Sequence, residues 1–225
     1  MVRRILTEAL IARAFPTFPP DDPDAIPLMP QDAIDASHAQ TFADVEAAED
    51  VWLFGYGSLM WNPDIAFAER RTARLRGWHR RFCLWQWRFR GSRERPGLMM
   101  ALDRGGSCVG AAFRIAGPDA AAKLGKTWRR EMIGMAYRPI WVGLETTAGP
   151  VRAVTFVADR RSHRYAGRRS IAEEATLIAQ ACGHVGPSAT YLLETWRHCE
   201  EIGIRDPMLR ALQSKVAELL EENHR

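Results

Sequence analysis

The stretch that decides the fold reads Val51-Trp52-Leu53-Phe54-Gly55-Tyr56-Gly57-Ser58-Leu59-Met60-Trp61. Its first residues are apolar and predict a buried strand, which the two glycines around Tyr56 end in a loop. Glycine allows a backbone to approach a ligand closely. Successive backbone N–H groups at the end of a strand can bind a carboxylate or an oxyanion. A tight turn without chemistry explains the same residues, so the loop alone leaves both interpretations open.

The loop does not match the common nucleotide-binding motifs. It lacks the third glycine of a dinucleotide fingerprint, because position 60 is Met, and no Gly-Lys-Ser/Thr follows it. The next residues, Trp61-Asn62-Pro63-Asp64, are typical of a turn and not of the start of a helix.

The composition is that of an ordinary soluble globular protein, with 225 residues, 47% apolar and 26% charged. No apolar run approaches the roughly 20 residues that a membrane helix needs, and the charged N-terminus does not resemble a signal peptide. We therefore expect a cytoplasmic protein without a membrane partner. The four cysteines have no Cys-x-x-Cys spacing and the six histidines no His-x-x-x-His pair, so we expect no metal site.

Charge is distributed unevenly along the chain. Residues 1–50 carry a net charge of −7, residues 51–225 carry +11, and the whole chain carries +4. Eleven arginines but only two acidic residues lie between Arg70 and Arg104. Such a segment attracts anions, and it fits a nucleic-acid surface, a pocket for a small carboxylate or a plainly solvated face. No nucleic-acid motif accompanies the arginines, so we expect no nucleic-acid partner.

The order of the elements predicts an α+β protein. Residues 1–50 are expected to form an acidic extension, made of a helix, a proline-rich linker and a second helix, before a main domain over 51–225. Strands are expected at 72–87, 138–146 and 150–158, and a hairpin at 98–102 and 107–115 turning at 103–106. One helix over 117–133 is inserted, and three follow at 170–182, 188–202 and 207–222. This order favours a mixed or barrel-like central sheet with flanking helices.

One carboxylate lies on the apolar side of the inserted helix. Helical spacing places Glu131 on one stripe with four apolar residues, while Arg129 and Arg130 are expected to point elsewhere. That stripe consists of Leu124, Trp128, Glu131, Met132 and Met135. Burial disfavours a charged carboxylate and raises its pKa, as a general acid/base near neutral pH requires. The alternative is a structural ion pair with an arginine such as Arg138.

Four blocks in family order resemble the ChaC-like family of glutathione-specific γ-glutamylcyclotransferases. The resemblance covers roughly residues 51–220. Its blocks are Phe54–Trp61, the run from Gly77-Trp78-His79-Arg80-Arg81 to Phe113-Arg114, Trp128-Arg129-Arg130-Glu131-Met132 with Tyr137-Arg138-Pro139, and Tyr165-Ala166-Gly167 with Gly186-Pro187-Ser188. It implies a γ-glutamylcyclotransferase-like fold, a mixed β-barrel with flanking helices.

The resemblance also implies roles for particular residues. Glu131 would be the catalytic acid/base, and the substrate-binding residues would be Tyr56, Gly57, Ser58, Leu59, Arg81 and Tyr165. The implied reaction is attack of the α-amine of glutathione on its own γ-carbonyl, which releases 5-oxoproline and Cys-Gly. It requires no cofactor and no metal, and we expect a monomer whose partner is the small-molecule substrate.

Two alternatives stay open at this stage. The enzyme could act on other γ-glutamyl amines or peptides, or the chain could be a non-catalytic glutathione-binding regulator of the same fold.

Overall fold

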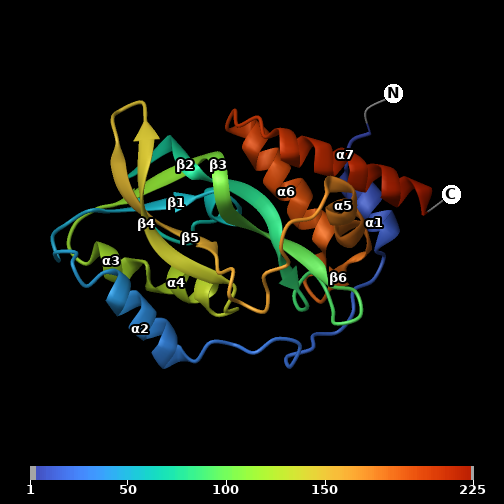
Figure 1. Ribbon diagram of the computed structural model, residues 1–225, viewed down its shortest axis with the longest axis horizontal. Helices are drawn as coiled ribbons and strands as arrows, with labels where there is room; N and C mark the ends of the chain where they lie inside the picture. Colours follow the sequence, from blue (N-terminus) through green and yellow to red (C-terminus); the bar gives the residue numbers. More distant parts are fainter. Residues whose placement is uncertain (1–3, 224–225) are drawn as a thin grey trace. The chain divides into compact units, whose positions relative to one another are not determined.

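A computed structural model describes residues 4–223 of the chain (Figure 1). The chain forms two compact units. One, here called the barrel unit, contains residues 27–81 and 101–163. The other, here called the helical unit, contains the described residues up to 26, residues 82–100 and those from 164 onward.

Five strands form a closed barrel in the order β1-β3-β2-β4-β5. The strand β1 pairs antiparallel with β3 but parallel with β5, so the barrel is mixed, and the predicted α+β fold class is confirmed. The strands are β1 (Val51–Gly55), β2 (Glu69–Gln86), β3 (Gly97–Ile115), β4 (Tyr137–Thr146) and β5 (Val151–Ala158).

The register of three strands defines one rim of the barrel. In the parallel pair, Leu53 of β1 lies opposite Val154 of β5. Continuing this register places Gly57, just beyond β1, level with Ala158 at the end of β5. The first residue of β4, Tyr137, lies opposite the same Ala158. The exits of β1 and β5 and the start of β4 therefore meet at one edge, here called the β1–β5 rim.

The helices of the barrel unit pack against one face of the barrel. They are α2 (Gln31–Thr41), η1, a 3₁₀ turn (Ser58–Met60), α3 (Ala120–Lys123) and α4 (Gly125–Met132). Figure 1 shows α2 beside α4, two helices that contact each other. Phe42, Trp128 and Phe156 join these helices to β5, with ring centroids 5.2 Å and 5.1 Å apart along the series. This aromatic core fixes α4 on the barrel.

In the helical unit, α7 packs against the other three helices (Figure 1). The elements are α1 (Glu8–Ala14), α5 (Ile171–Gln180), α6 (Ser188–Glu201), α7 (Pro207–Glu222) and the short strands β6 (Cys182–Gly183) and β7 (Gly186–Pro187). The helices expected at 170–182, 188–202 and 207–222 are thus confirmed, as are the strands expected at 72–87, 138–146 and 150–158. The pair β6–β7 was not predicted.

The hairpin expected at 103–106 is wrong. The chain runs through this segment as one strand of 19 residues. Gly105 and Gly106 do adopt positive φ, 103° and 66°, as turn residues would. Here the two glycines bend a continuous strand instead of reversing it, because β3 pairs within the barrel on both sides of them, with β5 at Leu102 and with β1 over residues 111–115.

The single helix expected over 117–133 is also wrong. It divides at Leu124 into α3 and α4, and the second part starts at Gly125, a residue with low helix propensity.

The acidic N-terminal segment contributes residues to both units and packs within each of them. In the helical unit, Asp21 pairs with Arg88 at 2.7 Å. In the barrel unit, Asp50 pairs with Arg114 at 2.7 Å. Ile34 and Phe42, in and directly after α2, belong to the core cluster under α4. Two arginines of the 70–104 segment, Arg88 and Arg93, are therefore partly neutralised by Asp21 and Asp22, which weakens the case for a nucleic-acid surface.

Candidate active site

The glycine-rich loop leaves β1 at the β1–β5 rim and makes one 3₁₀ turn. Met60 N donates to the Gly57 carbonyl oxygen at 2.8 Å, and Asn62 N donates to that of Ser58 at 2.8 Å. The N–H groups of Gly57, Ser58 and Leu59 come before these bonds and have no backbone acceptor among the residues that the structure describes. Three successive donors are therefore free to bind an oxyanion or a carboxylate.

Gly55 is required because the turn folds back onto it. A Cβ atom at this position would lie 2.9 Å from Leu59 Cβ and 3.0 Å from the Leu59 carbonyl carbon. Both contacts are too close, so a larger residue would push the loop away from the strand.

We predict that Gly55→Ala lowers turnover at least about tenfold and unfolding stability by about 1–3 kcal/mol, because the added methyl group overpacks the loop. The matched control is Gly143→Ala in β4, where nothing lies within 4 Å of the added Cβ. Thermal unfolding and turnover of the two variants check this. Equal behaviour of the two would contradict the close packing of the loop.

The Tyr56 side chain anchors the loop to the barrel. Tyr56 is 5% exposed, and its hydroxyl donates to the Phe156 carbonyl oxygen of β5 at 2.8 Å. This bond holds the loop on the strand that ends at Ala158. The substrate contacts expected of Tyr56, Gly57, Ser58 and Leu59 stay predictions, and the backbone of this turn is the part best placed to provide them.

The side chain of Arg80, which the sequence did not single out, supports the same loop. It is 4% exposed, and its Nε donates to the Tyr56 carbonyl oxygen at 2.6 Å. Its Nη2 donates to the Val109 carbonyl oxygen of β3. A buried cation thus fixes the start of the loop from inside the barrel.

A bulge explains why Arg80 points inward. Before Gly77 the buried residues of β2 are at odd positions, Ala73 and Leu75. After Gly77 they are at even positions apart from Cys83, namely Arg80, Phe82, Leu84 and Gln86. Gly77 has φ of 80° and shifts the alternation by one residue. Alternate residues of a strand face the same side, so Arg80 shares a face with the apolar residues Phe82 and Leu84. This pattern could have placed Arg80 on the inner face of the barrel.

Glu131 lies near the end of α4 with 13% of its side chain exposed. Its Oε1 accepts from Arg130 Nε at 3.1 Å, and Arg130 Nη2 lies 3.0 Å from it. Burial raises the pKa of this carboxyl, and the charge of Arg130 opposes the rise without cancelling it. The predicted direction of the pKa shift is therefore confirmed. The expectation that Arg130 points elsewhere is wrong, since its long side chain turns back onto its neighbour.

The apolar stripe around Glu131 is real but shorter than expected. Leu124 and Trp128 are 1% exposed and Met132 is 4% exposed. Met135, by contrast, is 38% exposed with φ of 53°, because α4 ends at Met132 before reaching it.

Three contacts hold α4 against the segment that follows the loop. Thr127 Oγ1 donates to the Pro63 carbonyl oxygen at 2.9 Å, and Arg130 Nη1 donates to that of Asn62 at 2.9 Å. Lys126 pairs with Asp64 at 2.8 Å. Leu59 belongs to the same buried cluster as Trp128. The helix that carries the carboxyl and the turn that carries the free N–H groups are thus packed as one body.

The two remaining predicted site residues lie in different units. Arg81 ends the β2 segment of the barrel unit, and its role in binding stays a prediction. Tyr165 lies in the helical unit, where its backbone forms an isolated antiparallel β-bridge with Leu84. Its contribution to the site also stays a prediction. No group of three His, Cys, Asp or Glu side chains suited to a metal occurs in residues 4–223, and no helix there is long and apolar enough to cross a membrane.

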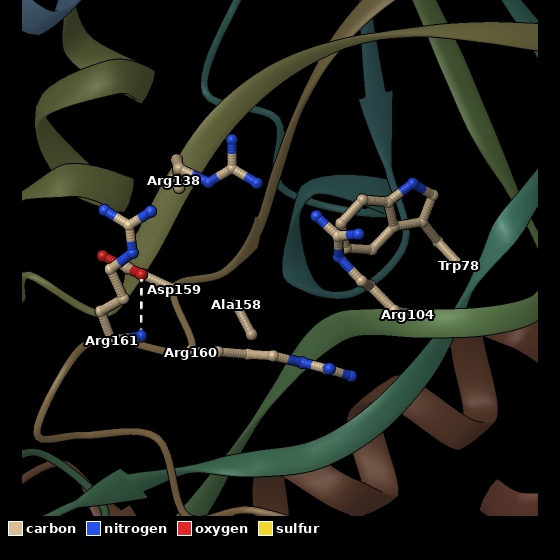
Figure 2. Close-up of a pocket in the computed structure, with 7 residues that line it drawn as sticks. All are labelled: Trp78, Arg104, Arg138, Ala158, Asp159, Arg160 and Arg161. Carbon is tan, nitrogen blue, oxygen red and sulfur yellow. Dashed lines mark hydrogen bonds between the residues drawn. The ribbon is translucent and has the colours of Figure 1, made fainter.

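A cavity of about 330 Å³ opens at the β1–β5 rim, where Ala158 is part of its lining. Figure 2 shows Arg138 and Arg161 on one side of it and Trp78 and Arg104 on the other. Its lining consists of Trp78, Arg104, Arg138, Ala158, Asp159, Arg160 and Arg161. Arg104 lies over the indole of Trp78, 5.7 Å from the ring centroid.

Comparison with solved structures defines the fold class. The chain is similar to a yeast γ-glutamylcyclotransferase specific to glutathione, with a TM-score of 0.70 and 17% identity over 78% of this chain and 99% of that one. At this identity the likeness shows the fold alone.

Sequence comparison identifies the family. The model of the ChaC-like protein family matches residues 51–219, so the chain belongs to that family. It is 40% identical over 189 residues to the glutathione-specific γ-glutamylcyclotransferase of Escherichia coli K12, covering 84% of this chain and 82% of the relative. It is 32% identical over 177 residues to the mouse glutathione-specific γ-glutamylcyclotransferase 1, covering 76% of this chain and 79% of that protein.

Proposed function

We propose that this chain is a glutathione-specific γ-glutamylcyclotransferase. The observation that carries the proposal is the placement of a largely buried carboxyl with a raised pKa, Glu131, on a helix packed against the Gly57–Leu59 turn and the segment that follows it. The named relatives with which the chain shares most of its length support the choice of glutathione as substrate.

In the proposed mechanism the substrate is both nucleophile and electrophile. Glu131 takes a proton from the α-ammonium group of glutathione, and the freed amine attacks the γ-carbonyl carbon. The amide C–N bond then breaks as Glu131 returns this proton to the departing nitrogen. The attacking nitrogen gives up its second proton to the released amine, so 5-oxoproline leaves as a neutral lactam and Cys-Gly leaves with an ammonium group. No water is consumed. Holding amine and carbonyl together is a large part of the rate enhancement, because the attack is intramolecular.

The loop provides the electrostatic part of the mechanism. N–H groups of Gly57, Ser58 and Leu59 would stabilise the oxygen that becomes negative in the tetrahedral intermediate, or hold the α-carboxylate. Tyr56 and Arg80 keep these donors in place through the bonds to Phe156 and Tyr56.

Turnover of a substrate panel tests the proposal. The purified protein should release 5-oxoproline and Cys-Gly in equal amounts from glutathione, and act much more slowly on γ-glutamyl amines without the Cys-Gly part. If the protein acts on those amines but not on glutathione, the assigned substrate is wrong, while the assigned reaction, cyclisation of a γ-glutamyl group, still holds. Binding of glutathione without any product would favour a regulator.

The raised pKa of Glu131 makes a prediction about pH. Glu131 must be ionised to act as a base, so kcat should fall as pH drops through its raised pKa, with a midpoint above the ordinary value of 4.5. Arg130 lowers this pKa, and Arg130→Met should therefore shift the acidic limb of the pH profile to higher pH. The control is Arg129→Met, an exposed arginine of the same helix. A limb that Arg130→Met does not move would contradict the coupling.

The sequence adds two expectations to this proposal, a cytoplasmic location and a monomeric state. Cell fractionation and sedimentation of the purified protein check them.

A further inference from the structure

The cavity at the β1–β5 rim has an excess of positive charge. Four arginines and one acidic residue, Asp159, line it. Arg160 is neutralised from outside the lining, because its Nη2 lies 2.6 Å from Asp103, which is 1% exposed. Asp159 Oδ1 accepts from the backbone N–H of Arg161 at 3.0 Å, as the dashed line in Figure 2 shows.

Three guanidinium groups are left without a carboxylate. Those of Arg104, Arg138 and Arg161 make no ion pair with any residue that the structure describes. Arg138 and Arg161 lie on the same side of the cavity in Figure 2, and both are exposed. Arginine binds carboxylates through two parallel N–H···O bonds, so this side is suited to a carboxylate ligand.

The cavity lies next to the proposed chemistry. Arg138 follows Tyr137, whose partner Ala158 is both level with Gly57 and part of the cavity lining. Asp159 N donates to the Ala136 carbonyl oxygen at 3.0 Å, and Ser162 Oγ donates to that of Met135 at 2.8 Å. The segment that lines the cavity is thus bonded to the short connection between Glu131 and β4.

The geometry points to a specificity subsite, and we propose that Arg138 and Arg161 bind the glycyl carboxylate of glutathione. The inference rests on the proposed function. The Cys-Gly part of the substrate spans about 7 Å when extended, which suits a second binding point on the same rim. With the γ-glutamyl end held by the Gly57–Leu59 turn, this second point distinguishes glutathione from shorter or uncharged γ-glutamyl amides.

The test compares two substrates that differ in one charge, glutathione and its glycinamide analogue, in which the glycyl carboxylate is an amide. The wild-type protein should prefer glutathione in kcat/KM by roughly 10- to 100-fold, the range expected for hydrogen bonds to a charged group. The double variant Arg138→Gln/Arg161→Gln should lose this preference through a higher KM for glutathione, with kcat/KM for the amide unchanged. The control is Arg152→Gln, whose arginine stacks on Trp141 in the barrel unit.

Four outcomes separate the proposed subsite from the proposed function. Loss of the preference in the double variant alone supports the subsite. An equal loss on both substrates, or a preference that survives in a folded double variant, overturns it. If the wild-type protein converts neither substrate, the proposed function fails and the subsite fails with it.

Discussion

Replacement of Glu131 by Gln should abolish most of the release of 5-oxoproline from glutathione. The amide keeps the size of the side chain and can still accept a hydrogen bond from Arg130, but it cannot take and return a proton. General acid/base catalysis contributes about 10²- to 10⁴-fold, and kcat should fall by this factor. The matched control is Glu145→Gln, which removes an exposed carboxylate paired with Arg76 in the same unit.

Stability measurements separate this loss from unfolding. Because the pKa of Glu131 is raised in the folded protein, the folded state binds its proton more tightly than the unfolded state does. The contribution of this group to the free energy of unfolding is therefore present below its unfolded pKa and is lost as pH rises through its folded pKa. At neutral pH, Glu131→Gln should be at least as stable as the wild type. A stable variant with near-normal turnover would contradict the assignment of Glu131.

Replacement of Arg80 by Met should damage stability and activity together. The buried carbonyl oxygens of Tyr56 and Val109 would both lose a charged donor. Leaving such groups unsatisfied costs about 3 kcal/mol of unfolding free energy. The loop would also lose its inner support, and kcat/KM should fall by about 10²-fold.

An exposed arginine of the same strand serves as the reference for Arg80. Arg76 pairs with Glu145 in solvent, so Arg76→Met should destabilise the protein much less than Arg80→Met does. Urea unfolding gives the free energy of unfolding of each variant, and glutathione turnover gives its kcat/KM, so the two variants can be compared directly. If Arg80→Met is no more destabilising than Arg76→Met, the buried hydrogen bonds do not support the loop.

The overall fold could be predicted because long periodic segments and ordered family blocks agree. The helices after residue 170 and the strands β4 and β5 follow from such patterns. The hairpin at Gly105 and Gly106 was wrong for a physical reason. The pair supplies the positive φ of a turn, but local conformation does not say whether a strand reverses or only bends. Closure of the barrel, a property of the whole chain, decides between the two.

The site could be predicted in part. Helical spacing placed Glu131 in an apolar environment, and its raised pKa agrees. The helical spacing did not reveal that Arg130 turns back to pair with Glu131, because spacing fixes the direction of the Cα–Cβ bond and not the conformation of a long side chain. Arg80 was missed because the bulge at Gly77 changes which residues of β2 face inward. The arginine-lined cavity brings together residues from β2, β3, β4 and the segment after β5, which no single stretch of sequence displays.

The most direct test of the central claim is turnover of glutathione in ¹⁸O-labelled water, with both products measured by mass spectrometry. Intramolecular attack by the α-amine predicts 5-oxoproline and Cys-Gly in equal amounts, with no label from the solvent in the newly released 5-oxoproline. Labelled glutamate, the product of hydrolysis, or the absence of any product would contradict the account.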